Sequence, residues 1–178
     1  MAIEPISSHK ELLDSFKHIF KVMKAEKKPL EVLSEEGWSP YKAKDFLLTE
    51  GLETGYYNKL LNEWFAATPL VQFGEGFIQD NVAYYVDGTE KIAKTLKIQL
   101  NVNDSSRSTF AKEKLLGLSC ALSQASLNQE LSESMMNAIL NSDDYSEFHG
   151  NKKLSIQTEV WAEHKFNGYD TIFMVASI

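Results

Sequence analysis

The chain has 178 residues, of which 43% are hydrophobic and 24% are charged, and its formal net charge at pH 7 is −7. This composition is close to the average of globular domains, so a hydrophobic core can form, and it argues against an intrinsically disordered chain. No uncharged apolar run is long enough for a membrane-spanning helix, and the first ten residues lack the pattern of a secretory signal. The single cysteine, Cys120, excludes an internal disulfide framework. We therefore expect a cytoplasmic protein without a membrane partner.

The balance of basic and acidic residues argues against a nucleic-acid partner. Phosphate binding requires a surplus of lysine and arginine on some surface, and neither half of this chain is basic. Arg107 is the only arginine, although arginine is the side chain best suited to bidentate contacts with phosphates and guanines.

The first third of the chain has the apolar spacing of short helices. Ser8 and Glu11 form a capping box at the start of one helix, and Ser39 followed by proline starts another that Gly51 can end. Thr54 can cap a third helix. The apolar residues of this third helix recur at helical spacing and comprise Tyr56, Tyr57, Leu60, Leu61, Trp64 and Phe65. We expect residues 1–68 to form a helical subdomain.

The periodicity changes after residue 68. Residues 82–86 form a short β-type run, and residues 96–102 alternate between apolar and polar side chains, which predicts a half-buried strand. Helical spacing returns from Ser108 and again after Asn128. Residues 69–178 are therefore expected to form an antiparallel sheet of about five strands with helices packed on one face. The predicted fold class is α+β, with the two parts either separate or joined in one unit.

A long hairpin is predicted at the end of the chain. Asn167-Gly168 lies between two alternating runs, a pattern typical of a two-residue type I′ turn. This turn places Phe166 opposite Tyr169 and Val160 opposite Val175, on an apolar face that meets the helices.

Three short motifs are better explained by structure than by chemistry. Residues 117–121 resemble the nucleophile elbow of hydrolases, but the final glycine is absent and the segment lies in a predicted helix. Gly74-Glu75-Gly76 lacks the third glycine of a dinucleotide loop. Cys120 has no neighbouring cation in the sequence that would lower the pKa of its thiol. We expect no catalytic residue and no cofactor from these motifs.

One dense group of possible metal ligands lies between the second predicted helix and the terminal strands. Asp143, Asp144, Glu147 and His149 could hold a divalent cation through carboxylate oxygens and one imidazole. Their spacing fits no calcium-binding loop, so a solvated loop is the favoured interpretation and these residues remain weak candidates.

The outer face of the terminal hairpin is the strongest candidate for a binding surface. In the predicted register Trp161 lies opposite Met174, and Ile172 and Ile178 point to the same side. An apolar patch of this kind rarely stays exposed on a soluble monomer. The cover can be the N-terminal helices, a second copy of the chain or a different protein.

The leading hypothesis is a non-enzymatic protein-binding module: an adaptor, chaperone or inhibitor that binds its partner through the C-terminal sheet. The last strand could also pair with a partner strand at a sheet edge. The acidic charge favours a basic partner.

Two alternatives remain. In the first, the chain is a small-molecule-binding protein or an enzyme with a pocket between the helical subdomain and the sheet, lined by Tyr56, Tyr57, Trp64 and Phe65. In the second, residues 41–64 form a helix-turn-helix that binds DNA and exposes Thr54, Tyr56, Asn58 and Lys59.

Overall fold

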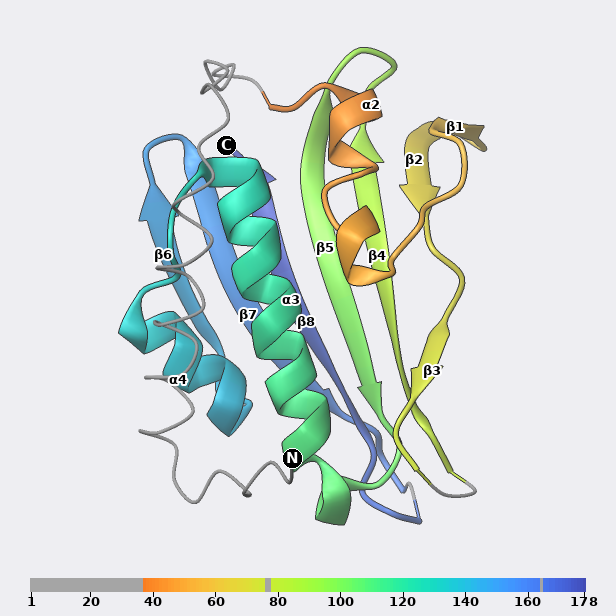
Figure 1. Ribbon diagram of the computed structural model, residues 1–178, viewed down its shortest axis with the longest axis vertical. Coiled ribbons are helices and arrows are strands. Elements are labelled where there is room, and N and C mark those ends of the chain that lie inside the picture. The colour runs from red at the N-terminus through yellow and green to blue at the C-terminus, as the bar shows by residue number, and fades with distance from the viewer. Residues whose placement is uncertain (1–36, 76–77, 164) are drawn as a thin grey trace, which may run out of the picture. The chain divides into compact units, whose positions relative to one another are not determined.

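An antiparallel sheet with helices on one face forms the described part of the chain (Figure 1). The computed structural model describes residues 37–75, 78–163 and 165–178. The sheet has eight strands in the order β1-β2-β4-β5-β8-β7-β6, and β3 pairs with β4. The predicted α+β class and the antiparallel sheet are confirmed, and the sheet has more strands than the five that the sequence suggested.

Two groups of strands that are consecutive in the chain make up this sheet. The first group comprises β1 (Asn58–Leu60), β2 (Glu63–Ala67), β3 (Val71–Phe73), β4 (Asp80–Gly88) and β5 (Ala93–Val102). The second group comprises β6 (Tyr145–His149), β7 (Lys152–Val160) and β8 (Tyr169–Ser177). The two groups meet where β5 pairs with β8, for example at Leu100 and Thr171.

Three α-helices are present in the described residues, namely α2 (Pro40–Ala43), α3 (Thr109–Leu127) and α4 (Glu133–Asn141). Figure 1 shows them on the same side of the sheet, with α3 crossing its middle and α4 in front of β6 and β7. Short 3-10 helices at Leu48–Glu50 and Ser105–Arg107 follow α2 and precede α3. None of the described helices is long and apolar enough to cross a lipid bilayer.

The hydrophobic core lies between the helices and the sheet, and the alternation of β5 places it there. Leu96, Ile98, Leu100 and Val102 are fully buried, whereas the residues between them are half-buried on the other face. Burying an aliphatic side chain of this size contributes about 1.5–3 kcal/mol, so this one strand is a large source of stability. The predicted strands over 82–86 and 96–102 and the two predicted helices after Ser108 are confirmed.

The third helix predicted in the first part of the chain is wrong. The residues after Thr54 form the short strands β1 and β2, and Leu61 occupies the turn between them with a φ of 57°. Tyr56 and Leu61 are each 90% exposed, so the apolar stripe expected of a helix here has no core to face. Pairing of β2 with β4 determines the structure, because sheet pairing outweighs a weak local helical preference. The helix predicted from Ser8 lies outside the described residues.

The register predicted for the terminal hairpin is also wrong, although its faces are right. Val175 pairs with Leu154 rather than Val160, a shift of six residues along β7, and the paired strands end at Val160 and Tyr169. A type I′ turn requires a positive φ at both central residues, but only Asn167 has one (50°) and Gly168 does not. An even shift keeps each strand side chain on its face, so Tyr169 and Val175 are buried as predicted, whereas Val160 and Phe166 are 68% and 37% exposed.

Candidate functional site

A cleft of about 410 Å³ lies at the end of the sheet where the connection from β3 to β4 approaches the connection from β5 to α3. Aromatic, acidic and basic side chains all contribute to its walls. The lining residues are Phe73, Gly74, Glu75, Ile78, Asp80, Asp104, Arg107 and Phe110. This volume falls within the range of small-molecule sites, about 300–1,000 Å³.

Local sequence accounts for the backbone on both sides of the cleft. β3 ends at Phe73, and Gly74 follows with a φ of 88°, a left-handed conformation that glycine adopts without steric cost. On the other side Asp104 caps the 3-10 helix before α3, because its Oδ1 accepts hydrogen bonds from Ser106 N at 3.0 Å and Ser106 Oγ at 2.6 Å.

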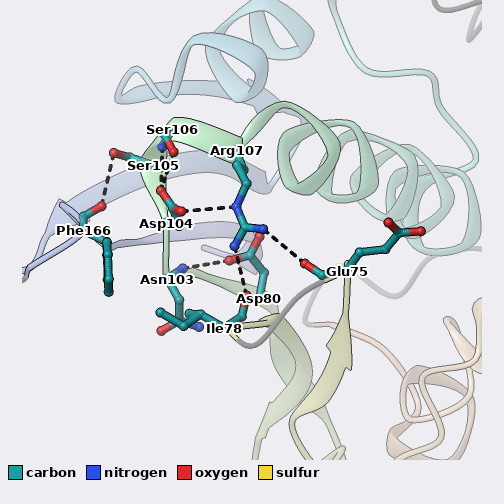
Figure 2. Close-up of polar contacts among 9 residues, drawn as sticks. All are labelled: Glu75, Ile78, Asp80, Asn103, Asp104, Ser105, Ser106, Arg107 and Phe166. Atoms are coloured by element: carbon teal, nitrogen blue, oxygen red, sulfur yellow. Dashed lines mark hydrogen bonds and ion pairs between the residues drawn. The ribbon is translucent and has the colours of Figure 1, made fainter.

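Arg107 connects these two sides. Its Nε donates to Asp104 Oδ2 at 3.2 Å, and its two terminal nitrogens donate to the carbonyl oxygens of Glu75 at 3.3 Å and Ile78 at 3.4 Å. Figure 2 shows the guanidinium between the carboxylate of Asp104 and the backbone that precedes β4. The side chain is 53% exposed, so these bonds orient the guanidinium without removing it from solvent.

Asp80 is the carboxylate at the base of the cleft. Its Oδ1 accepts a 2.8 Å hydrogen bond from the backbone N–H of Asn103, which ties the start of β4 to the end of β5. Burial raises the pKa of Asp80, and the nearby charge of Asp104 adds to this, while the Asn103 hydrogen bond and Arg107 act in the opposite direction. Asp104 behaves differently, because hydrogen bonds from Ser106 and Arg107 lower the pKa of its carboxyl.

The apolar wall of the cleft consists of two phenylalanines from different elements. The ring centroids of Phe73 and Phe110 lie 6.0 Å apart with an interplanar angle of 60°, a tilted arrangement that aromatic pairs favour. Phe110 is 58% exposed although it is a large apolar side chain. The ammonium of Lys114, on the next turn of α3, lies 5.6 Å from the centroid of the Phe73 ring.

The structure separates the four metal-ligand candidates. Glu147 and His149 meet on β6, where Glu147 Oε1 lies 3.0 Å from His149 Nε2 and Glu147 Oε2 accepts from Ser132 Oγ at 2.5 Å. Asp144 instead accepts a 2.8 Å hydrogen bond from the backbone N–H of Thr158, and Asp143 lies near Lys112. No group of three or more potential ligands comes together within the described ranges.

The four candidate partner-binding residues lie at or near the sheet face that carries no described helix. Ile172 lies between Gln99 and Gln157, and Met174 lies between Lys97 and Ser155, all half-buried to exposed except Ser155. The predicted pairing of Trp161 with Met174 is wrong, because Trp161 lies in the loop after β7 and its N–H donates to Gly168 O at 2.9 Å. Ile178 follows β8 and is 68% exposed. Neither edge of β8 is open, because it pairs with both β5 and β7.

The pocket expected between a helical subdomain and the sheet differs from the cleft observed. Tyr57 and Trp64 stack with ring centroids 6.0 Å apart across β1 and β2, and Tyr56 is 90% exposed. These side chains do not line the cleft. The helix-turn-helix interpretation of residues 41–64 is wrong, because its second helix is replaced by strands.

The region that resembles a nucleophile elbow is part of a buried helix. Gly117 to Ala121 lie within α3, and Ser119 and Cys120 are 0% and 2% exposed. Burial, with a smaller effect of the Glu130 charge, raises the pKa of the Cys120 thiol to about 12. A thiol in this environment stays protonated at neutral pH and cannot act as a nucleophile.

The chain matches no protein-family model, no curated protein sequence and no solved structure. The candidate site is therefore identified from the arrangement of its side chains alone. Sequence reasoning identified Arg107 only as a lone arginine and treated Gly74-Glu75-Gly76 as a bend. The run Asn103-Asp104-Ser105-Ser106 directly after a strand was a usable signal, since aspartate followed two residues later by serine is typical of a side-chain-capped turn.

Proposed function

We propose that this chain is a ligand-binding protein whose binding site is the cleft between Asp80, Arg107 and the two phenylalanines. The observation that carries the proposal is the convergence of these side chains, from three separate segments of the chain, on one cavity of about 410 Å³. Ligand sites typically combine an apolar wall with a few oriented polar groups, and both are present here.

The polar groups of the cleft are held in place before any ligand arrives. Asp80 is fixed by Asn103 N, and Arg107 is fixed by Asp104 and by two backbone carbonyls. Such preorganisation lowers the entropy that binding has to overcome. The exposed ring of Phe110 would gain contact area on binding, because an apolar ligand removes its surface from water.

The proposal is tested by screening small aromatic compounds against the ¹⁵N-labelled protein and mapping the backbone amides that shift. We expect shifts confined to residues 73–75, 78–80 and 104–110. Phe110→Ala should weaken every such compound at least about fivefold, since part of the apolar wall is removed. Phe148→Ala is the matched control, because Phe148 is 63% exposed on β6 and does not line the cleft. If no compound selectively shifts the cleft amides, the proposal fails.

A second function, binding of a protein partner on the open sheet face, is favoured by one observation. Ile172, Met174 and Ala176 form an apolar row along β8, on the face opposite α3 and α4. Polar residues of β5 and β7 flank this row, as at the rim of many protein interfaces. We propose a partner segment with an apolar stripe and basic flanks, in keeping with the acidic chain.

This second proposal predicts that Met174→Glu leaves the protein folded and removes the partner. The new carboxylate would lie beside Lys97, which limits the cost to the fold. A protein retained on immobilised wild type should bind purified wild type directly at a fixed stoichiometry and should not bind the variant. Unfolding of Met174→Glu would show that the row belongs to the core and would remove the support for this function.

A further inference from the structure

The polar atoms that line the cleft differ in whether they already have hydrogen-bond partners, and this difference indicates which kind of ligand the cleft can bind. Both oxygens of Asp104 already accept hydrogen bonds, from Ser106 and from Arg107. Each of the three nitrogens of the Arg107 guanidinium already donates one, to Asp104 or to a backbone carbonyl, and the two terminal nitrogens each keep a second N–H. Asp80 Oδ1 accepts from Asn103, but Asp80 Oδ2 has no hydrogen bond within the described chain. Asp80 Oδ2 is therefore an anionic acceptor on the cleft wall that is open to a ligand.

We propose that the cleft binds an organic cation, a primary amine carrying an aromatic or other apolar group, with its ammonium on Asp80 and its apolar part against Phe73 and Phe110. This inference rests on the proposed function of the cleft as a ligand site. An ammonium supplies donors to the free oxygen, and a charge-assisted hydrogen bond of this kind is stronger than a neutral one.

The charges around the cleft select for a cation in the same way. Three carboxylates line it, those of Glu75, Asp80 and Asp104, against the guanidinium of Arg107, and the ammonium of Lys114 lies beside the Phe73 ring. An anionic ligand bound to Arg107 would lie near Asp104 and the other carboxylates, which would repel it. A cation can bind to Asp80 and leave the Arg107 contacts intact. The net charge of −7 on the whole chain favours the approach of a cation from a distance.

The aromatic wall is compatible with a positive charge. The ammonium of Lys114 already lies 5.6 Å from the centre of the Phe73 ring, so this ring faces a cation of the chain itself. Phe110 offers a second ring, and 58% of its surface is exposed. An amine with a short aromatic group matches both features of the cleft at once.

The test compares three ligands of nearly the same size and shape by NMR titration: 2-phenylethylamine, 2-phenylethanol and 3-phenylpropionate. We expect the amine to bind wild type about tenfold more tightly than the alcohol, and the carboxylate to bind more weakly than the alcohol. Asp80→Asn retains an oxygen to accept from Asn103 N but removes the charge, and should reduce amine affinity to that of the alcohol. Asp87→Asn is the matched control, because Asp87 lies at the other end of β4 and its pKa is also raised by burial. It should leave all three affinities unchanged.

The outcomes separate this inference from the function on which it rests. If the carboxylate or the alcohol binds as tightly as the amine while the cleft amides shift, the cleft is a ligand site but the inferred preference for a cation is overturned. An unchanged amine affinity in Asp80→Asn overturns the role of Asp80 in the same way. If none of the three compounds shifts the cleft amides and the wider aromatic screen finds none that does, both proposals fail together.

Discussion

Asp80 and Asp104 line one cleft, yet the pKa of Asp80 is raised and that of Asp104 is lowered. Burial raises the first, whereas hydrogen bonds from Ser106 and Arg107 stabilise the charged form of the second. Ionisation of Asp80 therefore opposes folding, whereas ionisation of Asp104 favours it, although both side chains line one cleft.

Asp80→Asn should stabilise the protein relative to wild type as the pH rises. The folded-state pKa of Asp80 lies above its ordinary value of 3.8, so its contribution to stability is complete below pH 3.8 and is lost as the pH rises through the folded-state pKa. Asparagine does not titrate and keeps the acceptor for Asn103. We expect a gain in the free energy of unfolding of less than about 1 kcal/mol at neutral pH, because Asp80 remains partly solvated. Urea denaturation of both proteins from about pH 3 to 7 measures this difference. A difference that shrinks with rising pH would contradict the raised pKa.

Arg107→Lys should loosen the connection between β3 and β4. Lysine cannot reproduce the planar fork that reaches Asp104 and the carbonyls of Glu75 and Ile78 together. We expect amide hydrogen exchange at Glu75 and Ile78 to accelerate by about threefold or more, with a loss of stability below about 1 kcal/mol because the site is exposed. The amide of Trp161, in the loop between β7 and β8, serves as an internal control. Equal acceleration at Trp161 would indicate general destabilisation in place of a local effect.

Gly88→Ala should destabilise the fold, whereas Gly55→Ala should not. A Cβ at Gly88 would lie 2.2 Å from the carbonyl oxygen of Ile92, at the irregularity where β4 pairs with β5. At Gly55 the nearest atom, the carbonyl oxygen of Ala67, would be 3.9 Å away. We expect a loss of about 1–3 kcal/mol for Gly88→Ala and a change within about 0.5 kcal/mol for Gly55→Ala. Urea denaturation followed by tryptophan fluorescence gives both values, and equal effects would argue against the close approach at Gly88.

Cys120 should react slowly with thiol reagents in the native protein. It is 2% exposed and its pKa of about 12 leaves a thiolate fraction on the order of one in ten thousand at pH 8. Mixing the protein with a disulfide reagent should therefore label the thiol only as fast as the fold opens. The same reaction in denaturing urea provides the rate for the exposed thiol. Rapid stoichiometric labelling without urea would show that α3 does not bury this residue.

The sequence predicted those elements of the fold whose local pattern agrees with their tertiary role. The alternation of β5 and the apolar spacing of α3 each match the face that the structure buries, so period and packing point to one answer. The helix prediction for residues 56–65 failed because their apolar spacing fits a helix while their aromatic side chains also suit strands. β4 supplied a strand to pair with, and long-range pairing decided between the two.

The prediction of the terminal hairpin failed only in its register. The Asn167-Gly168 pattern indicated a tight turn, but the helices cover the sheet only as far as the start of β8, and Val160 at the end of β7 is already 68% exposed. Extending the hairpin would order further residues without burying them, which costs conformational entropy. Ser105 also donates its backbone N–H and its hydroxyl to the carbonyl of Phe166, a tertiary tie that no local pattern reveals.

The candidate cleft could not be predicted in the same way, because its residues share no motif. Phe73, Asp80 and Arg107 lie in three segments that only the pairing of β3, β4 and β5 brings together. A sequence can indicate that Asp104 caps a turn, but it cannot indicate that the turn faces Phe73. The order of the strands in the sheet has to be known before the residues of the cleft can be identified.

The pairing of β5 with β8 also has a consequence for the rate of folding. Val102 and Tyr169 are partners across this junction, and α3, α4, β6 and β7 lie between them in the chain. The hairpins on either side join residues that are close in sequence, so they can form early, whereas the junction has to close a long loop before it gains any contacts. We therefore expect the two halves of the sheet to form first, and the late joining of β5 to β8 to limit the overall rate.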